Sequence, residues 1–220
     1  MTAYEVSKRG LDLAVSSALI VVASPFLAAA AAAIKLEDRG PVIFRQERVG
    51  RDGKPFRILK FRTMVEDAHL KGPGYLVSEG DPRITRVGAF LRRWSLDELP
   101  QLFNIVRGEM SVVGPRPTLA YQVEQYSDFQ RRRLAVPPGV TGWAQIRGRN
   151  GLTWPERIEL DVWYVDHRSL GLDMKILLKT IGVIVRPDEV YNDARGDWGE
   201  EATAAGPGSP PPAPPERRPG

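Results

Sequence analysis

A long uncharged segment near the start of the chain is the strongest hydrophobic feature of the sequence. Residues 13–34 contain no charged side chain, and as a straight α-helix they would reach about 33 Å, enough to cross a bilayer's hydrocarbon layer. Pro25 lies inside this segment, where proline removes an amide donor and bends a helix, and the hydroxyl of Ser24 can hydrogen-bond the freed backbone. The pattern predicts a membrane helix broken at Ser24 and Pro25.

Flanking charges separate three membrane arrangements that agree with this pattern. Lys8 and Arg9 precede the segment, and basic residues also follow it at once: Lys35, Arg39, Arg45, Arg48 and Arg51. Positive charge on both sides favours keeping both ends in the cytoplasm, so we expect a re-entrant helical hairpin over residues 1–38. A single spanning helix and a cleaved signal peptide are the alternatives, although the segment exceeds a usual signal-peptide core.

Shorter patterns predict a mostly helical α+β domain that contains a small β-hairpin. Apolar residues at 42–44 and 56–61 flank a Gly-rich turn at 50–53, as in a hairpin. Helices are expected over residues 65–70, 86–94, 95–107, 119–134, from Pro155 onward and over 172–185, and a short strand at 111–113. Gly108 should end the third helix, and the fourth finishes with Arg131, Arg132 and Arg133, whose charges suit the end of a helix.

The last apolar segment and the C-terminal tail complete the expected organisation. Residues 172–185 are too short to span a membrane, so they form either a core helix or an interfacial amphipathic helix with snorkelling lysines. Residues 192–220 are rich in Gly, Ala, Pro and acidic residues and predict a disordered tail. We therefore divide the chain into a membrane hairpin (1–38), a cytoplasmic domain with interfacial helices (39–191) and a tail (192–220).

Composition restricts the available chemistry. The hydrophobic fraction of 42% and the charged fraction of 26% are those of a globular protein. No cysteine is present, which excludes disulfides, a thiolate nucleophile and a zinc-thiolate site, and His69 and His167 are the only histidines. Carboxylates, hydroxyls, lysines and arginines must therefore carry out any reaction.

The net charge of +4 combines a basic body with an acidic tail. Residues 186–220 carry four basic and seven acidic side chains, so residues 1–185 carry +7. Nine basic and four acidic side chains fall within residues 35–62, directly after the membrane segment. Such a region can bind anionic lipid headgroups or anionic substrates.

Two adjacent carboxylates, Asp97 and Glu98, are the best candidates for catalysis. Ser95 and Glu98 fit a capping box, which explains these two residues structurally and leaves Asp97 unexplained. The apolar residues fall on one helical face, which leaves the carboxylates outside the core: Leu96, Leu99, Leu102, Phe103 and Val106. Because the helix dipole, Arg92 and Arg93 favour the charged forms, we expect both carboxylates to be ionised. An ionised carboxylate can attack phosphorus while its neighbour binds Mg²⁺.

Basic side chains supply the complementary part of an anion site. The candidates are Lys60, Arg62, Arg83, Arg86, Arg92, Arg116, Arg147 and Arg149. Arg116 carries the most weight, because Pro115 and Pro117 stiffen its backbone and its forked donors suit phosphate oxygens. No P-loop or GxGxxG pattern occurs, so side chains and a metal would hold a diphosphate.

Three ordered motifs carry a resemblance to a known family. They are KFRTM at 60–64, DPRITRVGAFLRRWSLDELPQLFNIVRGEMSVVGPRP at 81–117 and PGVTGWAQIRGRN at 138–150. These motifs resemble the bacterial sugar transferases, monotopic phosphoglycosyl transferases, and the similarity runs from about Ser7 to Val185. Arg147 departs from the family pattern, which more often has a small polar residue there.

The resemblance implies a monotopic enzyme of the bacterial inner membrane with its catalytic domain facing the cytoplasm. It would move a sugar 1-phosphate from a UDP-sugar to undecaprenyl phosphate, release UMP and so initiate a lipid-linked glycan or exopolysaccharide. By the family pattern Asp97 is the nucleophile, Glu98 supports Mg²⁺, and Ser24 and Pro25 break the re-entrant helix. The substrate-binding candidates are Lys60, Arg62, Arg92, Arg116, Arg147 and Arg149.

Two rival functions from other classes agree with parts of the sequence. A membrane-tethered binder of nucleic acid or anionic lipid would use the +7 body and would be indifferent to replacement of Asp97 or Glu98. A noncatalytic scaffold would release no UMP. The intact carboxylate pair disfavours both, so we expect no nucleic-acid partner. The residues do not identify the sugar, the glycan pathway, the role of the tail or the oligomeric state, for which a homodimer is one option.

Overall fold

The computed structural model describes residues 2–68, 80–148 and 152–185, and helices dominate it. The helices are α1 (Ala3–Asp38), α2 (Arg86–Arg93), α3 (Gln101–Arg107), α4 (Ala120–Glu124), α5 (Asp128–Arg131), α6 (Trp143–Arg147), α7 (Trp154–His167) and α8 (Leu170–Val185), with 3-10 turns η1 (Arg51–Gly53), η3 (Leu96–Glu98) and η4 (Arg132–Ala135). Strand β1 (Ile43–Val49) pairs antiparallel with β2 (Pro55–Phe61), and β3 (Ser111–Val113) pairs parallel with β4 (Gly139–Thr141). The mostly helical class and the small hairpin are confirmed, whereas the predicted tail at 192–220 lies outside the described residues.

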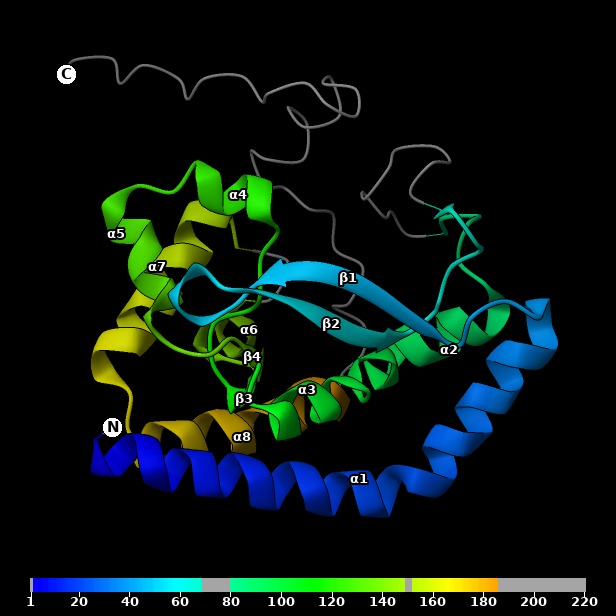
Figure 1. Ribbon diagram of the computed structural model, residues 1–220, viewed down its shortest axis with the longest axis horizontal. Helices are drawn as coiled ribbons and strands as arrows, with labels where there is room; N and C mark the ends of the chain where they lie inside the picture. The colour runs from blue at the N-terminus through cyan, green and yellow to red at the C-terminus, as the bar shows by residue number, and fades with distance from the viewer. Residues whose placement is uncertain (1, 69–79, 149–151, 186–220) are drawn as a thin grey trace.

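Helix α1 is a single bent helix of 36 residues. It continues across Pro25, and the hydroxyl of Ser24 donates to the carbonyl of Val21 at 2.8 Å. That carbonyl is the acceptor which Pro25, lacking an amide hydrogen, leaves free. A long first arm lies along one side of the molecule, and a second arm turns up beside α2 (Figure 1). The break predicted at Ser24 and Pro25 is thus a bend between two arms of one helix and not a pair of antiparallel helices.

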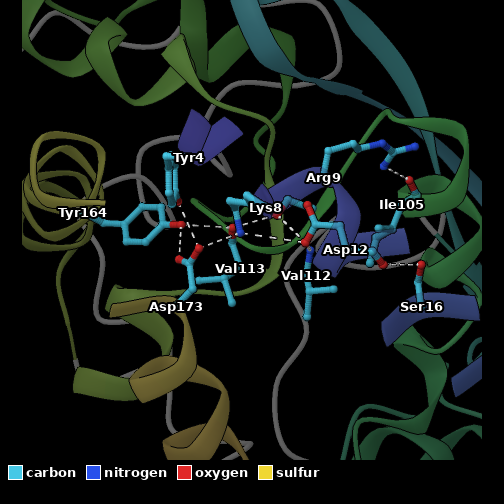
Figure 2. A network of polar contacts seen from close by, with 11 residues as sticks. Tyr4, Lys8, Arg9, Asp12, Ser16, Ile105, Val112, Val113, Tyr164 and Asp173 are labelled. Atoms are coloured by element: carbon cyan, nitrogen blue, oxygen red, sulfur yellow. Dashed lines mark hydrogen bonds and ion pairs between the residues drawn. The ribbon is translucent and has the colours of Figure 1, made fainter. Parts of the chain in front are cut away.

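Two buried carboxylates fix the first arm of α1 to the rest of the domain (Figure 2). Asp173 on α8 accepts hydrogen bonds from Tyr4 at 3.0 Å and Tyr164 at 2.6 Å, and its carboxylate lies 3.1 Å from the ammonium group of Lys8. Asp12 accepts two hydrogen bonds of 3.0 Å from β3, one from a backbone amide and one from a serine hydroxyl. These contacts satisfy charges that would be costly to bury alone.

Both ends of α1 therefore contact the same domain. Near the start, Arg9 donates at 2.6 and 2.9 Å to two carbonyls near the end of α3. At the other end, Glu37 accepts a hydrogen bond of 2.8 Å from the amide of Arg86, at the first turn of α2, and Asp38 forms an ion pair with Arg62. A carboxylate at a helix N-terminus is stabilised by the free amides there. Among the described residues, α1 is the one helix long and apolar enough to cross a membrane, with a mean hydropathy of 2.2 in its most apolar window.

The main hydrophobic core lies where β2, α3, β3, α6, α7 and α8 meet. Its buried members are Phe56, Ile58, Leu102, Ile105, Met110, Val112, Val113, Trp143, Tyr164 and Ile176. A second cluster joins the second arm of α1 to α2 and β2 through Ala30, Ile34, Leu91 and Phe61. Asp97 and Glu98 lie on η3, between α3, which contributes to the main core, and α2, which contributes to the second cluster.

Two helices differ from their predicted form. The segment 119–134 is divided into α4, α5 and η4, because Ser127 starts a new helix by accepting a hydrogen bond from the amide of Gln130. Of the segment 65–70, residues 65–67 form a turn with Asp67 in the left-handed region, residue 68 has 3-10 geometry, and residues 69 and 70 lie outside the described residues. Helix α8 is both a core and a surface element, since Asp173 and Ile176 are fully buried while an exposed apolar stripe runs along it: Leu170, Met174, Leu178 and Ile181.

Candidate active site

A short 3-10 turn, η3, presents Asp97 and Glu98 between α2 and α3. The predicted capping box is wrong. Ser95 has φ 54° and ψ 22°, in the left-handed region, and its side chain caps no amide. Its own amide donates instead to the carbonyl of Arg92 at 3.0 Å, which closes α2. Ser95 therefore forms a tight link between α2 and the carboxylate pair.

Helix α3 is rotated relative to the face that the apolar pattern predicts. Phe103 and Val106 are 42% and 39% exposed, whereas Gln101 and Asn104 are buried. Asn104 explains the rotation, because its amide group accepts a hydrogen bond of 3.0 Å from the amide of Leu59 and donates one of 2.8 Å to the carbonyl of Arg57. These bonds attach α3 to β2 on either side of position 58 and bring the next residues of that strand beside η3.

Glu98 is held by two cations from distant parts of the chain. Its Oε1 atom accepts a hydrogen bond of 2.7 Å from Nζ of Lys60, on β2, and one of 2.8 Å from Nη2 of Arg116, in the loop after β3. Although burial raises it, these two cations hold the pKa of Glu98 well below its usual range. No described residue donates to Oε2, so this oxygen is available to another ligand.

Asp97 lies beside the same cations but makes no hydrogen bond with any described residue. Burial raises the pKa of the Asp97 carboxyl above its ordinary value, as does the charge of Glu98, while Lys60, Arg92 and Arg116 oppose the shift. The cations lower the pKa of both carboxyls, but at Asp97 burial outweighs them. Ionisation of both groups at neutral pH stays a prediction. The pair therefore combines one strongly acidic carboxylate with one more basic carboxylate, a division of properties suited to catalysis.

A close contact between α2 and the backbone after β2 positions Arg92. A Cβ atom on Gly88 would lie 2.1 Å from the carbonyl oxygen of Thr63, so only glycine allows this approach. The approach lets Nε of Arg92 donate to the Thr63 hydroxyl at 2.8 Å. The terminal nitrogens of Arg92 bond no side chain or carbonyl of the described residues, and the charge of Arg92 acts on Asp97.

The remaining predicted binding residues do not all meet at η3. Arg62 is buried and pairs with Asp38 at the end of α1. Arg147 stacks on the ring of Trp143, with its guanidinium carbon 4.3 Å from the ring centroid. Arg149 lies outside the described residues. The structure therefore gathers Lys60, Arg92 and Arg116 around the dyad and directs Arg62 elsewhere.

Several residues that support the site could not be recognised from the sequence pattern. Asn104 binds β2, the buried Arg133 binds the backbone of Arg116, and Arg157 lies near enough to Arg116 for that like charge, after burial, to help lower the pKa of Arg157. A polar or charged residue in a polar stretch of sequence is normally predicted to lie on the surface. Only the long-range contacts reveal these roles.

The donor set fits a divalent cation that shares its coordination with a substrate. Within 2–68, 80–148 and 152–185, no group of three or more acidic or histidine side chains could enclose a metal. Mg²⁺ commonly binds one or two carboxylates and completes its shell with phosphate oxygens and water. The free Oε2 of Glu98 supplies one such carboxylate oxygen.

Comparison with known proteins places the chain in a family. Residues 3–187 match the bacterial sugar transferase family. The sugar transferase EpsL of Bacillus subtilis is 44% identical over 79% of this chain and 85% of its own length. The UDP-glucose:undecaprenyl-phosphate glucose-1-phosphate transferase of Caulobacter vibrioides is 43% identical over 86% of this chain and 73% of its own length.

Longer relatives share the same region. An Escherichia coli protein with the same name as the Caulobacter protein is 43% identical over 79% of this chain, which spans 39% of that relative's length. Several other relatives, from Haemophilus influenzae and Erwinia amylovora among others, are likewise matched over about two fifths of their length. The family match over residues 3–187 contains α1, the carboxylate pair, Lys60, Arg92 and Arg116. The chain belongs to the bacterial sugar transferase family.

Proposed function

We propose that this protein transfers a sugar 1-phosphate from a UDP-sugar to undecaprenyl phosphate and releases UMP, the first step of a lipid-linked glycan or exopolysaccharide. The observation that carries the proposal is the pair on η3, in which Glu98 binds two cations while the Asp97 carboxyl has no hydrogen bond to a described residue. Two relatives are named for this type of reaction with glucose 1-phosphate, and another is named for N-acetylgalactosamine phosphate.

In the proposed first step, an oxygen of the Asp97 carboxylate attacks the sugar-bearing phosphorus of the donor. A bond forms between this oxygen and phosphorus, the bridging phosphorus–oxygen bond breaks, and UMP leaves with the bonding electron pair. In the second step, a phosphate oxygen of the polyprenyl phosphate attacks the same phosphorus. The bond to Asp97 breaks, which regenerates the carboxylate and yields the lipid diphosphate sugar.

The charges around the pair suit both steps. Arg116 is exposed between the buried Pro115 and Pro117, so its guanidinium can bind phosphate oxygens without moving the backbone. Lys60 and Arg92 add positive charge beside Asp97. Glu98 would hold Mg²⁺ through its free oxygen, and the ion would neutralise negative charge on the diphosphate and the leaving UMP.

We further propose that α1 enters one leaflet and returns. Both of its ends contact the same domain, through Arg9 at the start and Glu37 at the end, which a helix with ends on opposite sides of a membrane could not do. The exposed stripe on α8 supports an interfacial position for that helix. In this proposed arrangement the carboxylate pair would lie at the cytoplasmic surface of the bacterial inner membrane, where a UDP-sugar from the cytosol would meet a lipid phosphate.

A groove of about 720 Å³ between α1 and α2 is a candidate binding site for the isoprenoid chain of the lipid acceptor. Glu37 and Arg86 are its charged lining residues. The others are alanines and aromatic or aliphatic residues: Phe26, Ala29, Ala30, Ala33, Val87, Phe90 and Leu91. Since α2 leads directly to η3, an isoprenoid chain in this groove would have its phosphate near the carboxylate pair.

The proposed reaction is tested by measuring UMP release from the full chain in lipid nanodiscs with Mg²⁺ and undecaprenyl phosphate. A panel of UDP-sugars should include at least one donor that gives UMP and a lipid-linked sugar, and omission of the acceptor should stop turnover. Absence of UMP with every donor would favour the scaffold alternative. Salt-dependent binding to nucleic acid without turnover would favour the binding alternative.

Single cysteines test the topology, since the natural sequence has none. We expect Ala3→Cys and Lys54→Cys, both at exposed positions, to escape an impermeant thiol reagent in intact spheroplasts and to react after the membrane is disrupted. Both sites would then face the cytoplasm. Labelling of Ala3→Cys alone in intact spheroplasts would indicate a spanning helix.

A further inference from the structure

Arg133, on η4, is buried although it is charged, with 3% of its side chain exposed. It forms an ion pair with the equally buried Asp161 on α7, and its Nη1 donates to the hydroxyl of Tyr126 at 2.6 Å. Its guanidinium also lies over two aromatic rings, 5.8 Å from the Tyr126 centroid and 5.7 Å from that of Trp154. So many partners immobilise the guanidinium and compensate for the cost of burying its charge.

One further bond of Arg133 reaches the active site. Its Nη2 donates to the backbone carbonyl of Arg116 at 2.9 Å. The side chain of that same residue, Arg116, donates to Glu98 at 2.8 Å. A chain of contacts therefore runs from Asp161 through Arg133 and Arg116 to the carboxylate pair.

The loop that carries Arg116 is fixed on its other sides by backbone contacts. A Cβ atom on Gly114 would lie 2.5 Å from the carbonyl oxygen of Pro137, and the amide of Gly139 donates to the carbonyl of Pro115 at 2.8 Å. After Arg116, the carbonyl of Thr118 accepts a hydrogen bond of 2.9 Å from β1. Between these two attachments, Arg48 approaches the carbonyl of Pro117 at 3.5 Å, and Arg133 is the one described residue whose side chain bonds the carbonyl of Arg116.

We infer that Arg133, held by Asp161 and Tyr126, is a positioning residue that keeps the Arg116 guanidinium directed at Glu98 and at the phosphates of the substrate. The inference rests on the proposed function. Arginine is required because three acceptors in different directions, one carboxylate, one hydroxyl and one carbonyl, need a planar fork of donors. A lysine ammonium, on a flexible stem, cannot reach all three in a fixed geometry.

A double-mutant cycle tests whether Arg133 acts through Arg116. We expect Arg133→Lys to lower kcat/KM for UMP release by about tenfold or more, and Tyr126→Phe, which removes a single hydroxyl, to lower it about threefold. In the Arg116→Ala background both changes should alter the residual rate less than twofold, because the residue that they position is gone. Arg132→Lys is the matched control, since Arg132 is exposed and pairs with Asp166 on the surface.

Hydrogen exchange of the segment 111–119 gives a second readout that needs no activity. Exchange should accelerate in Tyr126→Phe and stay unchanged in Arg132→Lys. Equal losses of kcat/KM in both backgrounds, or an unchanged exchange rate in Tyr126→Phe, would overturn the positioning role. A wild-type protein that releases no UMP would instead overturn the proposed function, and the exchange measurement would still decide the contact.

Discussion

Replacement of Asp97 by asparagine is expected to lower the rate of UMP release at least about 10³-fold, because removal of a nucleophile eliminates the covalent path. The side chain keeps its size and makes no hydrogen bond with a described residue, so the fold should be retained. With donor and Mg²⁺ but no acceptor, intact mass spectrometry of the wild type should show a phosphosugar adduct. Asp97→Asn should show none.

Asp128→Asn is the matched control for this change. Asp128 is an exposed aspartate at the start of α5, and its replacement should leave both the adduct and the rate intact. Retention of the adduct in Asp97→Asn would show that another residue is the nucleophile. Full activity without an adduct in the wild type would favour direct transfer between the two substrates.

Local sequence patterns were sufficient for the elements whose causes are local. The hairpin of β1 and β2 follows from apolar residues on both sides of a Gly-containing turn, and Gly108 ends α3 with φ 85°, a conformation that glycine adopts without strain. Pro25 and Ser24 likewise explain the bend of α1 from adjacent residues. In each case the residues that determine the structure lie within one or two turns of one another.

Patterns failed where a distant partner decides the local conformation. The sequence around Ser95 fits a capping box, yet Ser95 adopts φ 54°, since the chain must turn between α2 and η3 while both are packed against β2. Asn104 looks like a surface residue but is fully buried, because β2 offers a backbone donor and acceptor that match its amide group.

The candidate site shows the same division. Asp97 and Glu98 were proposed from two adjacent carboxylates and Arg116 from the prolines beside it, and the structure brings these three residues together. The roles of Arg62 and Arg133 could not be predicted from the sequence. Arg62 was expected to bind substrate, and Arg133 was expected to lie at the end of a helix. Arg62 is directed at Asp38 and Arg133 at Asp161, partners that lie 24 and 28 residues away.

Replacement of Glu98 by glutamine should lower both kcat and the pKa of Asp97. Loss of the carboxylate frees Lys60 and Arg116 to pair with Asp97, which masks the nucleophile, so kcat should fall about 10²-fold or more. Meanwhile the negative charge that helps raise the pKa of Asp97 is removed, so this pKa should fall. Because Asp97 must be ionised to attack phosphorus, the acid limb of the pH–rate profile lies at its pKa and should move to lower pH in Glu98→Gln.

The combination of a lower rate and a shifted acid limb separates this role of Glu98 from a purely structural one. Loss of folding would lower the amount of active enzyme at every pH without moving the limb. Glu124→Gln, at an exposed position on α4, should change neither quantity. The profile of kcat against pH should be measured at saturating donor and Mg²⁺ for all three proteins. If the limb stays in place or moves to higher pH, the charge of Glu98 does not act on Asp97, and the two carboxylates do not form a coupled pair.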